Sequence, residues 1–222
     1  MNTQPAPAMV KRAAPRRGRP LDAAKHRRII TAATEAFLKR GFNATSMDLV
    51  ARRAGVSKVT VYTHFTSKEA LFGAIIDVLA GSLVARIEEL ELGDHPPGPA
   101  LRQFGRKYLE LALAASSVAL HRVVVAEAAR APELGRLIFQ YGPVQIVDAL
   151  ARFLRSRKDL NLPDPRLAAE QFLGMVLGHG QLRLLLHARP AAEVRGSIAK
   201  VVDHAVEIFL SGVQASPHKS LS

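Results

Sequence analysis

Apolar residues recur three or four positions apart along most of the chain between residues 23 and 212, with polar residues between them. This spacing places the apolar residues on one face of a helix. No alternating apolar and polar run is long enough for a strand, so the pattern predicts an all-α fold of about nine helices. The expected helices span residues 23–40, 47–54, 58–65, 66–91, 99–115, 117–130, 143–158, 165–187 and 191–212, with a short one at 133–141.

Two clusters rich in proline interrupt the helical pattern. Residues 93–99 read Gly-Asp-His-Pro-Pro-Gly-Pro and form the clearest linker in the sequence. In the second break, Asp164 is expected to cap the following helix, with Pro165 in its first turn. The expected parts of the chain are a disordered basic arm, a DNA-binding head, a long helix leading into a ligand-binding and dimerisation body, and a tail. Their expected ranges are 1–21 for the arm, 22–72 for the head, 73–212 for the body and 213–222 for the tail.

Residues 46–65 have the pattern of a helix-turn-helix motif. Ser46 and Ser57 precede two short helical runs and can cap them. Between the runs, Gly55 stands where the chain must turn back, and a left-handed backbone there favours glycine. Three apolar residues are spaced to share one small core: Val50, Val56 and Val61. The second helix of such a motif lies in the DNA major groove, so this stretch predicts DNA binding.

The net charge of +12 is concentrated at the N-terminal end of the chain. Residues 1–72 carry 14 Lys and Arg against 4 Asp and Glu, whereas residues 73–222 carry 17 against 15. This asymmetry favours phosphate binding by the first third of the chain. Within the arm, Arg17 and Arg19 belong to a segment that resembles an AT-hook core. They are expected to contact DNA, either in a narrow minor groove or on phosphates without preference for sequence.

Other function classes lack their signatures in the sequence. There is no cysteine, which excludes disulfides and thiolate metal sites and is typical of a cytoplasmic protein. No apolar run of 18 residues is free of charge, so no membrane span is expected. We find no glycine-rich phosphate loop, no nucleophile elbow and no histidines or carboxylates at metal-ligand spacing. The sequence therefore predicts no enzyme, no cofactor and no metal.

Two groups of motifs resemble a known family. The motifs of the first third closely resemble the N-terminal domain of the TetR/AcrR family of bacterial transcriptional regulators. They are Gly41-Phe42, Thr45-Ser46, Ala54-Gly55-Val56-Ser57-Lys58, Tyr62, His64-Phe65, Ser67-Lys68-Glu69 and Leu71. The motifs of the second part resemble the C-terminal domain of the AefR-like subset of that family. They are residues 122–128, 132–134, 141–143 and 168–174. Together the two resemblances cover nearly all of residues 23–212.

The motif and the resemblance give a set of expected DNA contacts. The recognition helix offers donors and a methyl-bearing side chain to base edges and phosphates. These candidates are Ser57, Lys58, Val59, Thr60 and Thr63. In the family, further positions contact the phosphate backbone. The matching residues here are Ser46, Met47, Tyr62, His64 and Lys68.

The resemblance also implies an effector pocket among the middle helices and a dimer. Polar residues within the apolar helices that could line such a pocket are His121, Glu127, Gln140, Tyr141, Gln145 and His179. The resemblance further implies that the last two helices pair across a two-fold axis as a four-helix bundle. The expected interface residues are Phe172, Leu173, Val176, Leu177, Leu184, Val201, Ala205 and Ile208. The alternative is that these apolar faces only close the core of one chain.

Taken together, these observations predict a homodimeric, ligand-responsive repressor that binds a roughly palindromic double-stranded DNA operator. A small-molecule effector would release the protein from DNA by favouring the state that does not bind DNA. The alternative is a DNA-binding regulator or architectural protein without a small-molecule effector.

Overall fold

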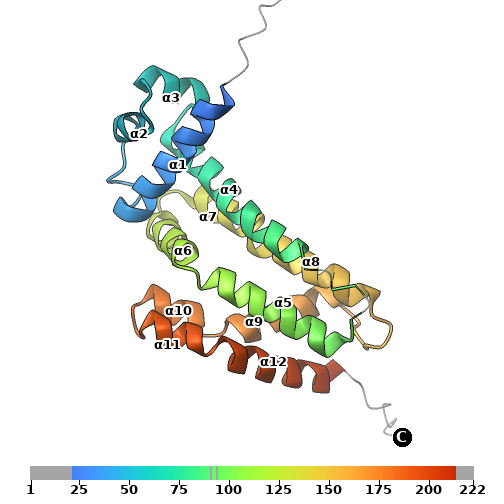
Figure 1. Cartoon of the computed structure of the whole chain (residues 1–222). Coiled ribbons are helices and arrows are strands. Elements are labelled where there is room, and N and C mark those ends of the chain that lie inside the picture. The colour runs from blue at the N-terminus through green and yellow to red at the C-terminus, as the bar shows by residue number, and fades with distance from the viewer. Residues whose placement is uncertain (1–21, 91, 94, 214–222) are drawn as a thin grey trace, which may run out of the picture.

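The computed structural model describes residues 22–90, 92–93 and 95–213. These residues form α-helices joined by short connections, and no strand occurs in the described part of the chain, so the prediction of an all-α fold is confirmed there. Figure 1 shows the three N-terminal helices at one end of the molecule, with a long fourth helix leading from them into the body. Arg17, Arg19 and the predicted tail beyond residue 213 lie outside the described residues.

The head begins with α1 (Ala23–Arg40), followed by α2 (Met47–Ala54) and α3 (Lys58–His64). Asp22 caps α1, because its Oδ1 accepts hydrogen bonds from the backbone amides of Ala24 and Lys25 at 3.0 and 3.2 Å. Gly41 ends this helix with a φ of 82°. The predicted bounds of all three helices hold to within one residue.

The buried side chains of the head form one apolar cluster that continues into the body. At its centre the rings of Phe37, Phe42 and Phe72 lie 5.0–5.6 Å apart. Phe72 belongs to α4 (Lys68–Glu88), and further buried residues come from α6 (Ala115–Glu127) and α7 (Pro132–Tyr141). The contributions of α6 and α7 are Leu120, Val123, Val124 and Leu134. The head therefore shares its core with two helices of the body.

By length and composition alone, α4 could cross a membrane, and α5 (Pro97–Ala112) and α6, bent by 61°, would also qualify if taken as one span. In the fold, however, α4 is a core helix. Its residues Leu71, Phe72, Ile75 and Ile76 are fully buried against the head and against α7. A core helix passes the same test of composition.

The body contains a second apolar cluster. It is formed by the second half of α4 with α5 (Pro97–Ala112), α8 (Pro143–Ser156), α9 (Pro165–Leu177) and α12 (Ile198–Val213). Two short helices, α10 (Gly180–Leu185) and α11 (Ala191–Gly196), lie beside α6 and α12 (Figure 1). As predicted, Asp164 caps α9 by accepting from the amides of Arg166 and Leu167 at 3.0 Å, with Pro165 in the first turn.

Several predicted helix boundaries are wrong. The helix predicted for 165–187 ends at Leu177, because Gly178 takes φ 43° and ψ −136°, a conformation that stops a helix. The helix predicted for 191–212 is broken at Ser197, whose hydroxyl donates to the carbonyl oxygen of Val194 at 2.8 Å. The fourth helix ends at Glu88 rather than near residue 91. The sixth ends at Glu127 rather than near residue 130.

Candidate DNA interface and ligand cavity

The helix-turn-helix forms because short-range hydrogen bonds hold both of its helices. Ser46 Oγ accepts from the backbone amide of Leu49 at 3.2 Å and starts α2. Ser57 Oγ accepts from the amide of Thr60 at 3.1 Å and starts α3. Between them Gly55 is left-handed, with φ 61° and ψ 42°. These contacts set where each helix begins and how the chain turns between them.

Arg28 of α1 fastens the turn of this motif. Its Nη2 donates to the carbonyl oxygen of Gly55 at 3.0 Å. A Cβ added to Gly55 would lie 2.6 Å from that nitrogen. The left-handed backbone therefore favours glycine at this position, and a larger residue would also force the Arg28 guanidinium to move.

The outer face of α3 exposes most of the residues that were predicted for the recognition surface. Val59 is 75% exposed and Tyr62 is 45% exposed, while Lys58 and Thr63 are also exposed. Thr60 is only half-buried, and its Oγ1 lies 2.8 Å from Ser57 Oγ. The face thus presents one cation, hydroxyl groups and an apolar methyl group, which are the groups that read base edges.

Lys58 is held by an ion pair across the motif. Its Nζ lies 3.0 Å from Asp48 Oδ1, and both side chains are about half exposed. The hydrogen bond and the charge of Asp48 raise the pKa of Lys58 above its usual value. The pair joins the first turn of α2 to the first turn of α3, and DNA phosphates would compete with Asp48 for this ammonium group.

Three of the residues predicted to contact the DNA phosphate backbone have surroundings that differ from the expectation. The side chain of Met47 is only 6% exposed and packs in the core of the head, so only its backbone amide is left to contact a phosphate. Lys68 Nζ donates to the carbonyl oxygen of Phe42 at 3.0 Å and lies 4.2 Å from the centre of that ring. His64 is half-buried, its ring centre lies 5.6 Å from that of His26, and its Nδ1 has no hydrogen-bond partner among the described residues.

A cationic groove beside the motif was not among the predicted sites. It lies between α1 and the C-terminal half of α2 and is lined by four arginines and one carboxylate. These residues are Arg27, Arg28, Arg52, Arg53 and Glu35. The signal in the sequence is two Arg-Arg pairs about 25 positions apart. Sequence alone does not show that they meet on one side of the head.

The body contains a largely apolar cavity of about 170 Å³ whose lining comes from the helices α4 to α10. Its apolar lining includes Leu79, Leu83, Leu111, Leu120, Ile138, Ile146 and Leu177. Its polar lining consists of Ser82, Arg86, Tyr108, Ser116, Ser117, His121 and Gln181. Burial raises the pKa of Tyr108 to about 12, so its phenol is neutral at physiological pH. An apolar cavity with a few polar groups is the usual form of a small-molecule site.

Of the six residues predicted to line an effector pocket, only His121 lines this cavity. Glu127 is buried at the other end of α6, where its Oε1 accepts a hydrogen bond from Asn43 Nδ2 at 2.6 Å. The other four side chains, Gln140, Tyr141, Gln145 and His179, are exposed and lie outside the lining. The other five lie elsewhere because a polar residue in an apolar helix can face solvent or another element as well as a cavity.

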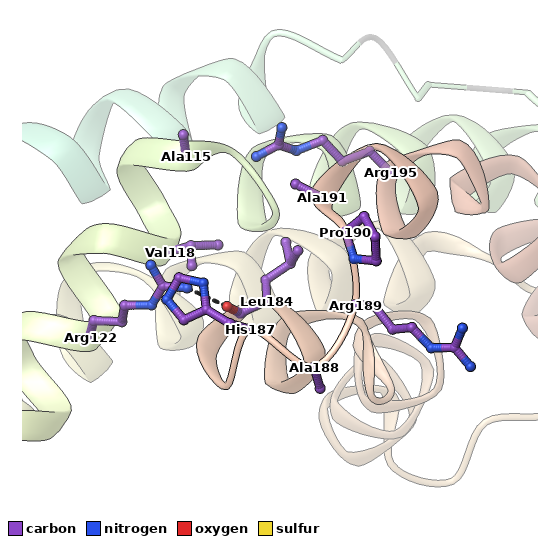
Figure 2. A pocket seen from close by; sticks show the side chains of 10 residues that line it. All are labelled: Ala115, Val118, Arg122, Leu184, His187, Ala188, Arg189, Pro190, Ala191 and Arg195. Atoms are coloured by element: carbon purple, nitrogen blue, oxygen red, sulfur yellow. Dashed lines mark hydrogen bonds between the residues drawn. The ribbon is translucent and has the colours of Figure 1, made fainter.

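A second, shallower depression lies between α6, α10 and α11 and is lined by three arginines and a histidine (Figure 2). Arg122 donates to the backbone carbonyl oxygens of Leu184 and Leu185. His187, at φ 53°, donates its backbone amide to the Leu184 oxygen, and Ala188 donates to that of Arg183. This is the pattern of a helix C-cap, and Arg122 supplies a cation at the negative end of α10. Figure 2 shows Arg189 pointing away from the depression.

The predicted interface residues separate into a buried and an exposed set. The side chains of Phe172, Leu173, Val176, Leu184 and Ala205 are at most 5% exposed within one chain, so they build its own core. Leu177 lines the cavity, Val201 is half-buried, and Ile208 is 50% exposed. A different set of apolar residues faces outward on α9 and α10. These are Leu167, Met175, Leu182 and Leu186, which are 36–67% exposed.

Comparison with known proteins assigns both parts of the chain to one family. Residues 29–75 match the family "Bacterial regulatory proteins, tetR family". Residues 99–212, about half of the chain, match "AefR-like transcriptional repressor, C-terminal domain".

Individual relatives agree with this assignment. A crystal structure of a TetR-family regulator from Mesorhizobium loti has 33% identity and a TM-score of 0.77, covering 86% of this chain and 97% of that one. The Flavonoid-responsive Regulator FrrA has 36% identity and a TM-score of 0.76, covering 88% and 100%. The HTH-type transcriptional regulator YhgD of Bacillus subtilis is 44% identical over 61 residues, which are 28% of this chain and 32% of that protein.

The match to this curated relative thus spans about a third of its length. The two family matches, in contrast, cover the head and the body separately. Their members are DNA-binding regulators and not enzymes. The chain therefore belongs to the TetR family of bacterial DNA-binding transcriptional regulators and carries an AefR-like C-terminal domain.

Proposed function

We propose that this protein is a repressor that binds a palindromic operator as a homodimer in the cytoplasm, and that a small molecule bound in the body releases it. The observation that carries the proposal is that α6 runs from the body cavity to the head. The first half of this helix lines the cavity, from Ser116 to His121, and its last residue, Glu127, is hydrogen-bonded to Asn43 of the head. A ligand that displaces α6 would therefore change the position of the head.

The recognition surface supports sequence-specific binding. Lys58, Val59, Tyr62 and Thr63 project from α3, and the arginines of the groove flank the motif. We propose that α3 enters the major groove and that Arg27, Arg52 and Arg53 contact phosphates beside it. Arg17 and Arg19 of the arm would extend the contact along the DNA.

The outward apolar row on α9 and α10 supports the dimer. Leu167 and Met175 of α9, Leu182 of α10 and Leu186 just after it are all exposed, and Ile208 is exposed on α12. Gly174 lies in the same row, and a Cβ added to it would meet no atom within 4 Å. A row of large apolar side chains beside open glycine surface is typical of a helix–helix interface.

Relatives support a repressor with an effector. The matched C-terminal family is described as a repressor domain, and FrrA is named as responsive to flavonoids. The apolar cavity of this chain gives a comparable molecule a place to bind. The AefR-like match and the cavity together favour release by a ligand over a regulator without an effector.

The test is to footprint the purified protein on the DNA upstream of its own gene, because many regulators control a neighbouring gene. The protected sequence is then placed before a reporter with and without the regulator. We expect an inverted repeat and lower reporter expression when the regulator is present. Protection without symmetry would contradict dimeric binding, and higher expression would contradict repression.

A further inference from the structure

The polar groups of the body cavity have a common hydrogen-bonding character. Ser117 Oγ donates its proton to the carbonyl oxygen of Leu111 at 2.7 Å. His121 Nδ1 lies 2.8 Å from the carbonyl oxygen of Ser117. A carbonyl oxygen can only accept, so Nδ1 carries the proton and Nε2 of the neutral ring carries a lone pair. At the edge of the cavity, Ser82 Oγ likewise donates to Leu79 at 2.9 Å. These three groups therefore have only lone pairs left for a ligand.

The other polar residues of the lining do not add a buried charge to these hydrogen-bond acceptors. Arg86 and Ser116 are exposed at the solvent side, where water screens the guanidinium. Gln181 and Tyr108 can each donate or accept. Among the residues that the structure describes, no Asp or Glu lines the cavity, so a ligand cation would find no carboxylate partner there. A ligand carboxylate would meet the lone pairs of Ser117 and His121, and burial without donors is costly for a charge.

Resting on the proposed function, which makes this cavity the effector site, we propose that the cavity selects an uncharged molecule with an apolar body and at least one hydroxyl donor. A phenol or an alcohol meets both conditions. The hydroxyl donates to His121 Nε2 or to Ser117 Oγ, while the leucine and isoleucine side chains take up the apolar body. A carboxylate or an ammonium group on the same body is rejected.

Four probes of one shape test this selection: 2-naphthol, naphthalene, 2-naphthoate and 2-naphthylmethylammonium. The chain has no tryptophan and three tyrosines, so naphthyl fluorescence reports binding directly. We expect 2-naphthol to bind about threefold to tenfold more tightly than naphthalene, the net effect of one hydrogen bond. Both charged probes should bind more than about tenfold more weakly than 2-naphthol. Equal or tighter binding of either charged probe overturns the proposal, as does the absence of any binding.

Variants at His121 test whether this residue causes the preference for 2-naphthol over naphthalene. His121→Phe keeps an aromatic ring but removes the acceptor, so it should abolish the advantage of 2-naphthol over naphthalene. His121→Gln restores an acceptor oxygen and should recover part of that advantage. His95→Phe, at an exposed position between α4 and α5, is the matched control and should behave as wild type. An advantage that survives in His121→Phe overturns the assignment to His121.

A parallel DNA-release measurement separates this inference from the proposed function. Selective binding of 2-naphthol with no loss of operator binding supports the ligand class and contradicts coupling of this cavity to DNA. Release by 2-naphthoate but not by 2-naphthol would support a ligand-responsive regulator and overturn the ligand class. Selective binding together with release by 2-naphthol supports both.

Discussion

Asn43 Nδ2 donates a hydrogen bond to Glu127 Oε1 at 2.6 Å, although the two residues are 84 positions apart in the chain. Asn43 lies in the connection between α1 and α2, and Glu127 is the last residue of α6. Glu127 is only 7% exposed, so its carboxylate has lost most of its water and depends on this donor. The bond ties the end of a cavity-lining helix to the DNA-binding head.

Asn43→Ala should lower the free energy of unfolding by about 1–3 kcal/mol, because it leaves a buried carboxylate without its donor. Urea denaturation of the purified protein measures this change. Glu127→Ala and the double variant complete a thermodynamic cycle that isolates the contribution of the pair. Glu110→Ala, at an exposed position on α5, is the control and should change stability by less than about 0.5 kcal/mol. Additive effects of the two single changes would contradict the coupling.

Gly55→Ala should destabilise the protein by at least about 1 kcal/mol. The residue has φ 61°, and the new Cβ would displace the Arg28 guanidinium, which lies 2.6 Å from the Cβ position. Gly81→Ala is the opposite case, because Gly81 lies within α4 and its Cβ would meet no atom within 4 Å. That change should stabilise the protein by about 0.5–1 kcal/mol. Equal effects of the two substitutions in thermal unfolding would show that the turn does not need glycine.

The parts of the fold that the sequence predicts well are those set by neighbouring residues. Ser46 and Ser57 cap their helices because each accepts from an amide three positions ahead, a distance visible in the sequence. The helix-turn-helix motif and the two family resemblances also rest on short sequence patterns. The uneven distribution of charge is read directly from the sequence. The hydrogen bond between Glu127 and Asn43 does not follow from such a pattern, because the two residues are 84 positions apart in the chain. Glu127 was therefore predicted as a ligand contact when it is a contact between head and body.

Helical periodicity shows which apolar residues share one face of a helix, but it does not show whether that face lies in the core or at the surface. Phe172 and Leu182 are both apolar residues of the penultimate predicted helix, yet Phe172 is fully buried and Leu182 is 49% exposed. The break at Gly178 lies between them and ends the first helix. Met47 shows the same limit in the head, since its place at a helix start did not reveal that its side chain packs into the core.

Lys58→Ala should weaken operator binding and reduce the slope of log affinity against log salt by about 1, because one phosphate or base-edge cation is lost. Asp48→Asn should have the opposite effect on affinity, since Asp48 lies 3.0 Å from the Lys58 ammonium and competes with DNA for it. Fluorescence anisotropy at several salt concentrations measures both. Lys158→Ala, at an exposed position in the body, is the control for a simple change of net charge. An unchanged slope in Lys58→Ala would place this side chain off the DNA.

Leu182→Glu should convert the proposed dimer into monomers. The side chain is 49% exposed in one chain and belongs to the outward apolar row of α9 and α10, so in a dimer a carboxylate there would be buried without a partner. Val78→Glu is a matched control, because Val78 is similarly exposed, at 51%, but lies on α4. Sedimentation or light scattering gives the mass of each variant. A dimer in Leu182→Glu with a monomer in Val78→Glu would place the interface on α4. Monomers in Leu182→Glu should also bind an operator half-site far more weakly than the dimer binds the whole operator, because the second head no longer adds to the affinity.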